Sequence, residues 1–282
     1  MENMDAMSLY GVFGHPVMHS LSPYMQNAAF AALGIKAVYM AFDVAPDDLG
    51  AAVAAIKALG LAGVNITIPH KLAIAPLLDE VAGDAAISGS VNTIVRRGAR
   101  LIGYSTDGEG FVRALREETG FDPRGKTACL LGSGGAAASL AVALTATGID
   151  ALTVVTRQGR LDRFPHLQKP AVVMTYEQLA SCPAPGPTWD IIVNCTPLGM
   201  WPLVDAMPPL PGHVFGPGVV AADLIYKPRK TKFLLRAEAA GAAIMGGLPM
   251  LVRQGAGSFE LWTGKKAPLD VMRRAVEALS QG

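Results

Sequence analysis

The sequence predicts an α/β protein with two domains, an N-terminal α/β domain and a Rossmann-type, doubly wound dinucleotide-binding domain. Short β-branched runs alternate with Ala-rich amphipathic stretches almost from end to end, as in proteins built on a parallel sheet. The chain has 282 residues, which is long enough for two domains. Its 31 Gly and 20 Pro residues exceed what a helical bundle would carry and suit many strand-to-helix turns.

In the first half, the alternation predicts strands and helices in turn. Strands are expected at 9–13, 38–42 and 63–68, and helices at 23–33 and 46–59. The second helix begins with Pro46, followed by Asp47 and Asp48. Proline suits the first turn of a helix, and the two acidic residues lie at the positive end of its dipole.

A second series of elements follows residue 107. Strands are expected at 127–131, 152–156, 191–194 and 219–222, with a helix at 136–147 that ends at Gly148. The Pro- and Gly-rich stretches 182–188 and 208–218 are expected to be surface loops. We therefore place a domain boundary near residue 107.

Composition and charge exclude several other classes of protein. Hydrophobic residues make up 51% of the chain and charged residues 17%, unlike a disordered protein. The 24 Lys and Arg residues nearly balance the 23 Asp and Glu residues, so no basic nucleic-acid surface is expected. A net charge of +1 suits a small-molecule partner instead.

Targeting signals and cysteine usage point to the cytoplasm. The first residues show no basic start before a secretory apolar run, and no stretch reaches ~18 uninterrupted apolar residues. Cys129, Cys182 and Cys195 are odd in number and lack C-x-x-C spacing, which argues against a disulfide scaffold and a zinc site. No histidine pair has H-x-x-x-H spacing. These patterns predict a cytoplasmic protein without a metal or membrane contact, either a monomer or a homodimer.

The clearest cofactor signal is the run LLGSGGAAA at 130–138. Gly132, Gly134 and Ala137 form G-x-G-x-x-A between an expected strand and an expected helix, which is the context of a dinucleotide-binding turn. The first glycine permits the tight turn, and the second lets the backbone approach a pyrophosphate. The small alanine lets helix and strand pack closely. A glycine triplet by itself is often only a turn, so the flanking strand and helix carry the prediction.

The end of the next expected strand indicates which nicotinamide cofactor binds. An acidic residue there bonds the ribose hydroxyls of NAD, whereas an arginine accommodates the 2′-phosphate of NADP. Here Thr156 is followed by Arg157 and Gln158, with no acidic residue. We therefore expect NADP, the alternative being that Arg157 is only a solvated surface residue.

A pair of serines precedes the first expected helix. Ser20 and Ser22 flank one residue just before Pro23. In an extended segment, side chains at i and i+2 point the same way, so the two hydroxyls could grip one ligand. The alternative is that Ser-x-Ser serves as a helix cap.

Further polar groups follow the expected strands of the first half. Asn65 and Thr67 lie on one face of a strand end, and Lys71 comes just beyond it. Asn92 and Asp107 follow later in the chain. Several amide and hydroxyl groups at strand ends suit a polyhydroxylated ligand better than an apolar one. Lys71 could supply a proton or a positive charge to a carbonyl oxygen, the alternative being a solvated surface lysine.

Eight runs in order along the chain resemble the shikimate dehydrogenase family. They are SLSP at 20–23, NITIPHK at 65–71, VNT at 91–93, STDG at 105–108, GSGGA at 132–136, NCTPLGM at 194–200, DLIY at 223–226 and MLVRQGA at 250–256. The resemblance covers nearly the whole chain. It implies NADP-linked reduction of 3-dehydroshikimate to shikimate in the chorismate pathway of aromatic amino-acid biosynthesis.

The resemblance also implies domains and residue roles. A substrate domain would comprise 1–106 and the C-terminal helices of 248–282, with an NADP-binding Rossmann domain at 107–247. Lys71 would be the catalytic lysine and Asp107 its partner. The substrate would contact Ser20, Ser22, Asn65, Thr67, Asn92, Tyr226 and Gln254. NADP would contact Gly132, Ser133, Gly134, Gly135, Ala136, Thr156, Arg157, Leu224 and Gly247.

Three positions depart from the family's pattern. Gln26 stands where the family often has His, and Ser105 where it usually has Asn. The family commonly has Glu twelve residues after the lysine as a cofactor contact, and this chain has Gly83 beside Asp84. The first two changes concern fine substrate contacts, and the third leaves that cofactor contact unassigned.

Two other functions remain open from the sequence. One is an NAD-linked quinate/shikimate dehydrogenase, which would prefer an acidic residue at or next to Arg157. The other is a catalytically silent NADP-binding sensor on the same fold. Retention of both Lys71 and Asp107 argues against the sensor.

Overall fold

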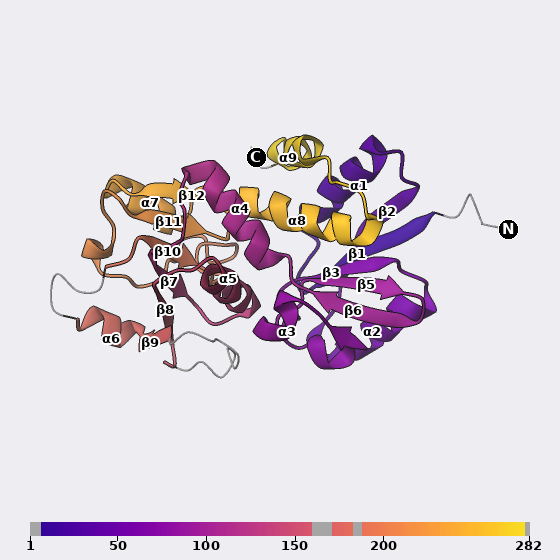
Figure 1. Ribbon diagram of the computed structural model, residues 1–282, viewed down its shortest axis with the longest axis horizontal. Helices are drawn as coiled ribbons and strands as arrows, with labels where there is room; N and C mark the ends of the chain where they lie inside the picture. Colours follow the sequence, from indigo (N-terminus) through magenta and orange to yellow (C-terminus); the bar gives the residue numbers. More distant parts are fainter. Residues whose placement is uncertain (1–6, 160–170, 183–187, 280–282) are drawn as a thin grey trace. The chain divides into compact units, whose positions relative to one another are not determined.

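The computed structural model describes residues 7–159, 171–182 and 188–279 (Figure 1). The chain divides into two compact units, one formed by 1–110 with 252–282 and the other by 111–251. Both borders fall inside helices, α4 (Asp107–Thr119) and α8 (Leu248–Thr263). The boundaries expected from the sequence, after 106 and after 247, coincide with the first residues of these helices.

The first unit contains a six-stranded sheet in the order β2-β1-β3-β5-β6-β4. Its strands are β1 (Ser8–Gly14), β2 (Ala37–Asp43), β3 (Gly63–Ile66), β4 (Glu80–Val81), β5 (Thr93–Arg97) and β6 (Arg100–Tyr104). The first three run parallel, as the alternation predicts. The expectation of a parallel sheet throughout is wrong here, because β5 pairs antiparallel with both β3 and β6. A short hairpin at Gly98, with φ of +60°, joins β5 to β6 and reverses the chain.

Helices cover both faces of this sheet. On one face, α2 (Leu49–Ala58) and α3 (Asp84–Ser88) pack on buried side chains of β3 and β5. On the other face, Tyr10 of β1 stacks on Phe30 of α1 (Ser22–Ala32), with ring centroids 5.0 Å apart, and lies 5.1 Å from the ring of Trp262 in α8. The expected helix at 46–59 is a 3₁₀ turn, Pro46–Asp48, followed by α2. Helix α9 (Leu269–Glu277) packs against α1.

Helix α8 lies close to the sheet because β3 begins with a glycine. A Cβ on Gly63 would overlap the indole ring of Trp262. The indole Nε1 of Trp262 donates to the carbonyl of Ile94 in β5 at 2.9 Å. This packing brings α8, with Gln254 and Ser258, onto a sheet formed by residues far earlier in the chain.

The second unit is a doubly wound parallel sheet. Its strands are β7 (Thr127–Leu131), β8 (Ala151–Thr156), β9 (Ala171–Thr175), β10 (Ile191–Asn194), β11 (Val220–Asp223) and β12 (Ala243–Met245). Their order, β9-β8-β7-β10-β11-β12, is the 3-2-1-4-5-6 order of dinucleotide-binding folds. The direction of winding changes between β7 and β10, and ligands of such sheets bind outside the carboxyl ends of the strands at that point. The doubly wound fold expected from the sequence is confirmed.

Alternate residues of the central strand β7 face the two sides of this sheet. Ala128 and Leu130 belong to a core formed with α4, α8 and α5 (Gly135–Ala146). Cys129 and Leu131 belong to the opposite core, formed with α6 (Tyr176–Ala180) and α7 (Lys232–Ala239). The predicted strands at 127–131 and 191–194 match β7 and β10. The predicted loop at 182–188 lies mostly outside the described residues. Within the described ranges, no helix is long and apolar enough to cross a membrane.

Candidate active site

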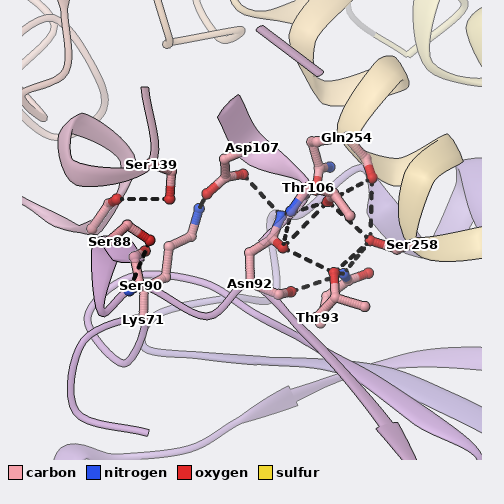
Figure 2. Close-up of polar contacts among 12 residues, drawn as sticks. Lys71, Ser88, Ser90, Asn92, Thr93, Thr106, Asp107, Ser139, Gln254 and Ser258 are labelled. Carbon is pink, nitrogen blue, oxygen red and sulfur yellow. Dashed lines mark hydrogen bonds and ion pairs between the residues drawn. The ribbon is translucent and has the colours of Figure 1, made fainter. Parts of the chain in front are cut away.

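Lys71 and Asp107 form a nearly buried ion pair in the first unit (Figure 2). Lys71 follows β3 in a turn that also carries His70, and Asp107 is the first residue of α4. The lysine Nζ lies 2.6 Å from Oδ2 of Asp107, and the two side chains are 16% and 3% exposed. A carboxylate at the start of a helix is also favoured by the helix dipole. The pair therefore presents a charged amine, held in one place, with a small part of its surface open to a ligand.

Asn92 holds the other oxygen of this carboxylate. Its Nδ2 donates to Oδ1 of Asp107 at 2.9 Å and to Oγ1 of Thr106 at 2.8 Å. Its Oδ1 accepts from the backbone N–H of Thr106 at 2.8 Å. Because a backbone N–H only donates, the amide oxygen must face it and the amide nitrogen must face Asp107. Both oxygens of Asp107 are thus engaged, one by Asn92 and one by Lys71.

Gln254 of α8 joins the same cluster. Its side-chain oxygen lies 3.1 Å from Nδ2 of Asn92, and its carbonyl accepts from Oγ1 of Thr106 at 2.9 Å. Helix α4 approaches α8 closely at this point, because a Cβ on Gly110 would lie 2.7 Å from the backbone nitrogen of Gln254. Helix α8 therefore contributes side chains to the polar site and does not only cover it.

A buried layer of amide and hydroxyl groups continues the cluster along the sheet. Asn65 of β3 accepts from the Tyr39 hydroxyl at 2.7 Å and donates to the carbonyl of Asn92 at 3.0 Å. Its Nδ2 also lies 2.9 Å from the hydroxyl of Ser258 in α8. Thr93 of β5 donates to Oδ1 of Asn92 at 2.9 Å. Burial raises the pKa of Tyr39 well above its usual value, so this phenol remains a donor.

The two serines before α1 do not form the extended pair that the sequence suggests. Leu21 between them has φ −82° and ψ −9°, which is helical backbone, and α1 begins at Ser22. The hydroxyl of Ser20 accepts from the backbone N–H of Ser22 at 3.2 Å. This bond closes a short turn before α1, and the N-cap residue, Leu21, has no side-chain capping bond, so the structure does not show Ser-x-Ser as a helix cap either. Ser22 is buried, and its side chain is hydrogen-bonded to Tyr39, which connects it to Asn65.

Thr67 and His70 lie in the segment between β3 and Lys71. The backbone N–H of Thr67 donates to the carbonyl of Phe13 at 2.9 Å, and a Cβ on Gly14 would overlap the Thr67 methyl group. His70 is 1% exposed, and its Nε2 lies 2.7 Å from the carbonyl of Val44. The histidine thus anchors the turn that presents Lys71, as expected of a structural residue.

The three residues that depart from the family pattern, Gln26, Gly83 and Ser105, lie in different structural environments. Gln26 is fully buried and donates from Nε2 to the carbonyl of Gly255 in α8 at 2.9 Å. Gly83 has φ of +59° at the start of α3, a conformation that strains a glutamate. Ser105 is partly buried directly before Thr106.

The glycine-rich turn of the second unit has the form that a dinucleotide requires. Gly132 has φ of +106°, and its N–H donates to the carbonyl of Val155 at 2.8 Å. A Cβ on Gly134 would meet no atom within 4 Å, so the backbone at the start of α5 is open to a close-lying group. Ala137 is fully buried in the contact between helix and sheet. Ser133, Gly135 and Ala136 complete the turn, partly exposed.

Strand β8 ends at the residues that the sequence assigns to the cofactor ribose. Thr156 is buried, and its hydroxyl accepts from the N–H of Gly159 at 2.8 Å, which forms the turn after the strand. Arg157 follows with an exposed side chain. Residues 155–158 include no acidic side chain, so the charged group at the position that binds the ribose in dinucleotide-binding folds is the guanidinium of Arg157.

Asp223 organises the carboxyl ends of β10 and β11. One oxygen accepts from the Thr231 hydroxyl at 2.6 Å and from Asn194 Nδ2 at 3.1 Å, and the other accepts from the N–H of Ile225 at 3.0 Å. Burial nevertheless raises the pKa of Asp223 to about 6, with the three hydrogen bonds acting in the opposite direction. These bonds shape the turn that carries Leu224 and Tyr226.

Gly247 lies against this turn. Its N–H donates to the carbonyl of Ile225 at 3.0 Å, and a Cβ on Gly247 would overlap the carbonyl of Leu224. Only glycine permits this approach without moving the backbone. The structure therefore places Leu224, Tyr226 and Gly247 in the second unit, and Lys71 with its polar neighbours in the first.

Four residues of the polar cluster were absent from the predicted set. They are Tyr39, Thr93, Thr106 and Ser258. Thr93 and Thr106 adjoin predicted residues within the matched runs, so their positions were visible in the sequence. Ser258 lies one helical turn after Gln254, which puts both on one helix face. Tyr39 carries no local signal, because its role depends on the pairing of β2 with β1.

Among the described residues, no group of three or more His, Cys, Asp and Glu side chains could hold a metal ion. The second unit has the strand order and glycine turn of a dinucleotide-binding domain, and the first unit holds a lysine and a carboxylate among amides and hydroxyls. This combination is typical of dinucleotide-dependent oxidoreductases.

Comparison with known proteins identifies the family. Residues 12–94 match the shikimate dehydrogenase substrate binding domain, and 247–277 match the shikimate 5′-dehydrogenase C-terminal domain. The chain is 48% identical over 275 residues to a shikimate dehydrogenase (NADP(+)) from Moorella thermoacetica, covering 95% of this chain and 92% of that protein. The chain therefore belongs to the shikimate dehydrogenase family.

Solved structures show the same fold in enzymes with different names. Shikimate 5-dehydrogenase from Thermus thermophilus, in complex with NADP(H) and shikimate, is 34% identical with a TM-score of 0.83. That match covers 96% of this chain and 99% of that one. A ligand-free 5-ketofructose reductase of Gluconobacter sp. strain CHM43 is 33% identical with a TM-score of 0.82, covering 97% and 99%. Likeness of fold thus does not by itself decide the substrate.

Proposed function

We propose that the protein is an NADP-dependent shikimate dehydrogenase that reduces 3-dehydroshikimate to shikimate in the chorismate pathway. The observation that carries the proposal is the Lys71–Asp107 pair, 2.6 Å apart and bordered by Asn92. The names of close relatives, such as that of Moorella thermoacetica, support the same reaction. The substrate cluster lies in the first unit and the NADP-binding elements in the second.

Lys71 is the proton donor in the direction of reduction. NADPH, when bound, supplies the hydride to the ketone carbon, and the carbonyl oxygen becomes an alkoxide that needs a proton. Lys71 donates that proton from Nζ, and Asp107 keeps the amine positioned through its Oδ2. Asn92 prevents the carboxylate from turning away, because it holds the second oxygen.

The ring hydroxyls of the substrate are bound by the polar side chains around this pair. Asn65, Thr67, Asn92 and Gln254 offer amide and hydroxyl groups, which suit a polyhydroxylated ring. Ser20, Ser22 and Tyr226 are the further substrate contacts that the resemblance to the family implies.

The cofactor elements of the second unit fit NADP. The open backbone at Gly134 and the positive end of α5 suit a pyrophosphate. Arg157 is exposed after β8, and its guanidinium would pair with the 2′-phosphate of NADP. We place the enzyme in the cytoplasm, because its three cysteines are free thiols, as is usual in a reducing compartment.

A steady-state assay tests the proposal. We expect the purified chain to form NADPH from shikimate and NADP⁺. The value of kcat/KM should be at least about tenfold lower when NAD⁺ replaces NADP⁺, or when quinate replaces shikimate. Activity that prefers quinate and NAD⁺ would favour the catabolic alternative. Reduction of 5-ketofructose, with none of 3-dehydroshikimate, would assign the chain to the other activity found on this fold.

A further inference from the structure

Ser258 of α8 is fully buried and contacts two strands of the sheet. Its Oγ lies 2.9 Å from Nδ2 of Asn65 in β3. It also lies 2.7 Å from Oγ1 of Thr93 in β5 (Figure 2). A third, longer contact of 3.2 Å joins it to the carbonyl of Gln254 in its own helix. A single hydroxyl of α8 thus contacts residues that are 193 and 165 positions away in the chain.

Hydrogen bonds connect Ser258 to Asn92 through Thr93. The Thr93 hydroxyl donates to Oδ1 of Asn92 at 2.9 Å. In the 2.7 Å contact between Thr93 and Ser258 either hydroxyl can be the donor, because Ser258 also has an acceptor in the carbonyl of Gln254 at 3.2 Å. The Ser258 hydroxyl is thus one residue removed from the Asn92 amide.

The second contact of Ser258 fixes Asn65. The amide oxygen of Asn65 accepts from the Tyr39 hydroxyl at 2.7 Å, so its Nδ2 faces the opposite way. Nδ2 has acceptors in the hydroxyl of Ser258 at 2.9 Å, the carbonyl of Asn92 at 3.0 Å and the hydroxyl of Thr93 at 3.2 Å. Loss of the Ser258 hydroxyl would remove the shortest of these three contacts from a buried amide.

We propose that Ser258 is a positioning residue, which orients the side-chain amides of Asn65 and Asn92 for contact with the hydroxyl groups of shikimate. This proposal rests on the proposed function. It differs from a role in packing alone, because Asn65, which Ser258 contacts, and Asn92, which it reaches through Thr93, both belong to the proposed substrate-binding set. It also gives α8 a part in substrate recognition beyond Gln254.

Replacing Ser258 with alanine tests this role. We expect Ser258→Ala to weaken shikimate binding about three- to tenfold, since one buried hydrogen-bonded group is lost. The KM for shikimate should rise by a similar factor, whereas kcat and the Kd for NADP⁺ should change less than about twofold. Equal losses for both ligands, or unchanged shikimate binding, would overturn the proposal.

Thr263→Val is the matched control on the same helix. The Thr263 hydroxyl donates to the carbonyl of Phe259 at 2.8 Å and accepts from Lys265 N–H at 3.1 Å, away from the substrate set. We expect this variant to lower the thermal midpoint without changing the Kd for shikimate. An equal loss of shikimate affinity in Thr263→Val would mean that any destabilised α8 weakens binding, which contradicts positioning by Ser258.

A double-mutant cycle separates positioning from general destabilisation. If Ser258 acts partly through Asn65, then adding Ser258→Ala to Asn65→Ala should cost less than about twofold further in the Kd for shikimate, measured by calorimetry. Additive losses would overturn the proposal.

Where Ser258→Ala does not fold, Ser258→Cys replaces it, because a thiol is a weak hydrogen-bonding group of similar shape. Failure of both variants to fold would make Ser258 a core residue only. Absence of shikimate turnover in the unmodified protein would instead reject the proposed function.

Discussion

Nζ of Lys71 lies 2.6 Å from Oδ2 of Asp107, and the carboxylate is almost fully shielded from solvent. The two residues come from different elements, a turn after β3 and the first position of α4. Because the second carboxylate oxygen is held by Asn92 at 2.9 Å, Asp107 can keep the amine in one place throughout a reaction. The pair should therefore behave as one functional unit.

Mutation of this unit should reduce turnover strongly. We expect Lys71→Ala to lower kcat about 10²-fold or more, with a much smaller change in the KM for shikimate, because a proton donor is lost. Asp107→Asn should also lower kcat, and the double variant should lose far less than the product of the two effects. Lys57→Ala is the control, because Lys57 pairs with Asp79 at 2.8 Å on the surface of the same unit. A change in KM alone would make Lys71 a binding residue.

Arg157 should determine the choice between cofactors. If its guanidinium pairs with the 2′-phosphate, Arg157→Ala should weaken NADP⁺ by about ten- to a hundredfold and leave NAD⁺ nearly unchanged. Binding constants for both cofactors check this, with Arg124→Ala as an exposed control in the second unit. Equal losses for the two cofactors would show that Arg157 does not contact the phosphate.

Asp223 should make the stability of the protein depend on pH. Its folded-state pKa of about 6 lies above the ordinary value of 3.8, so the folded state binds the proton more tightly than the unfolded state. The resulting stabilisation is complete below about pH 3.8 and is lost as pH rises through about 6. Between about pH 5 and 7.5 the loss amounts to roughly 1.4 kcal/mol.

Comparison with Asp223→Asn isolates this contribution from the other carboxylates. The free energy of unfolding of the unmodified protein, relative to the variant, should fall by that amount as pH rises from about 5 to 7.5. Urea unfolding at the two pH values measures the difference. A constant difference between the two proteins would contradict the raised pKa.

Gly247→Ala should disturb the turn after β11. The added Cβ would overlap backbone atoms of Leu224 and Ile225, which cannot move aside as a flexible side chain could. We expect a loss of about 1–3 kcal/mol in stability and weaker NADP⁺ binding. Gly216→Ala is the control in the same unit, because a Cβ there would meet no atom within 4 Å. Unchanged NADP⁺ affinity in Gly247→Ala would argue against this turn as a cofactor contact.

Features that depend on neighbouring residues could be predicted from the sequence. The dinucleotide turn was visible because Gly132, Gly134 and Ala137 lie between a β-branched run and an Ala-rich run, and the structure has β7 and α5 there. The strands at 127–131 and 191–194 were predicted for the same reason. Lys71 and Asp107 were visible as members of short runs that resemble a known family.

The pairing of strands and the contacts between distant side chains depend on how the whole chain packs. Residue periodicity indicates a strand but not its partner or direction, so the antiparallel pairing of β5 with β3 was missed. The helical conformation of Leu21 was missed as well, because Ser-x-Ser fits either an extended segment or a cap. Ser258 reaches Asn65 across 193 positions because burial of Trp262 against Gly63 brings α8 onto the sheet. Such contacts arise from the packing of a whole core, and no local pattern encodes them.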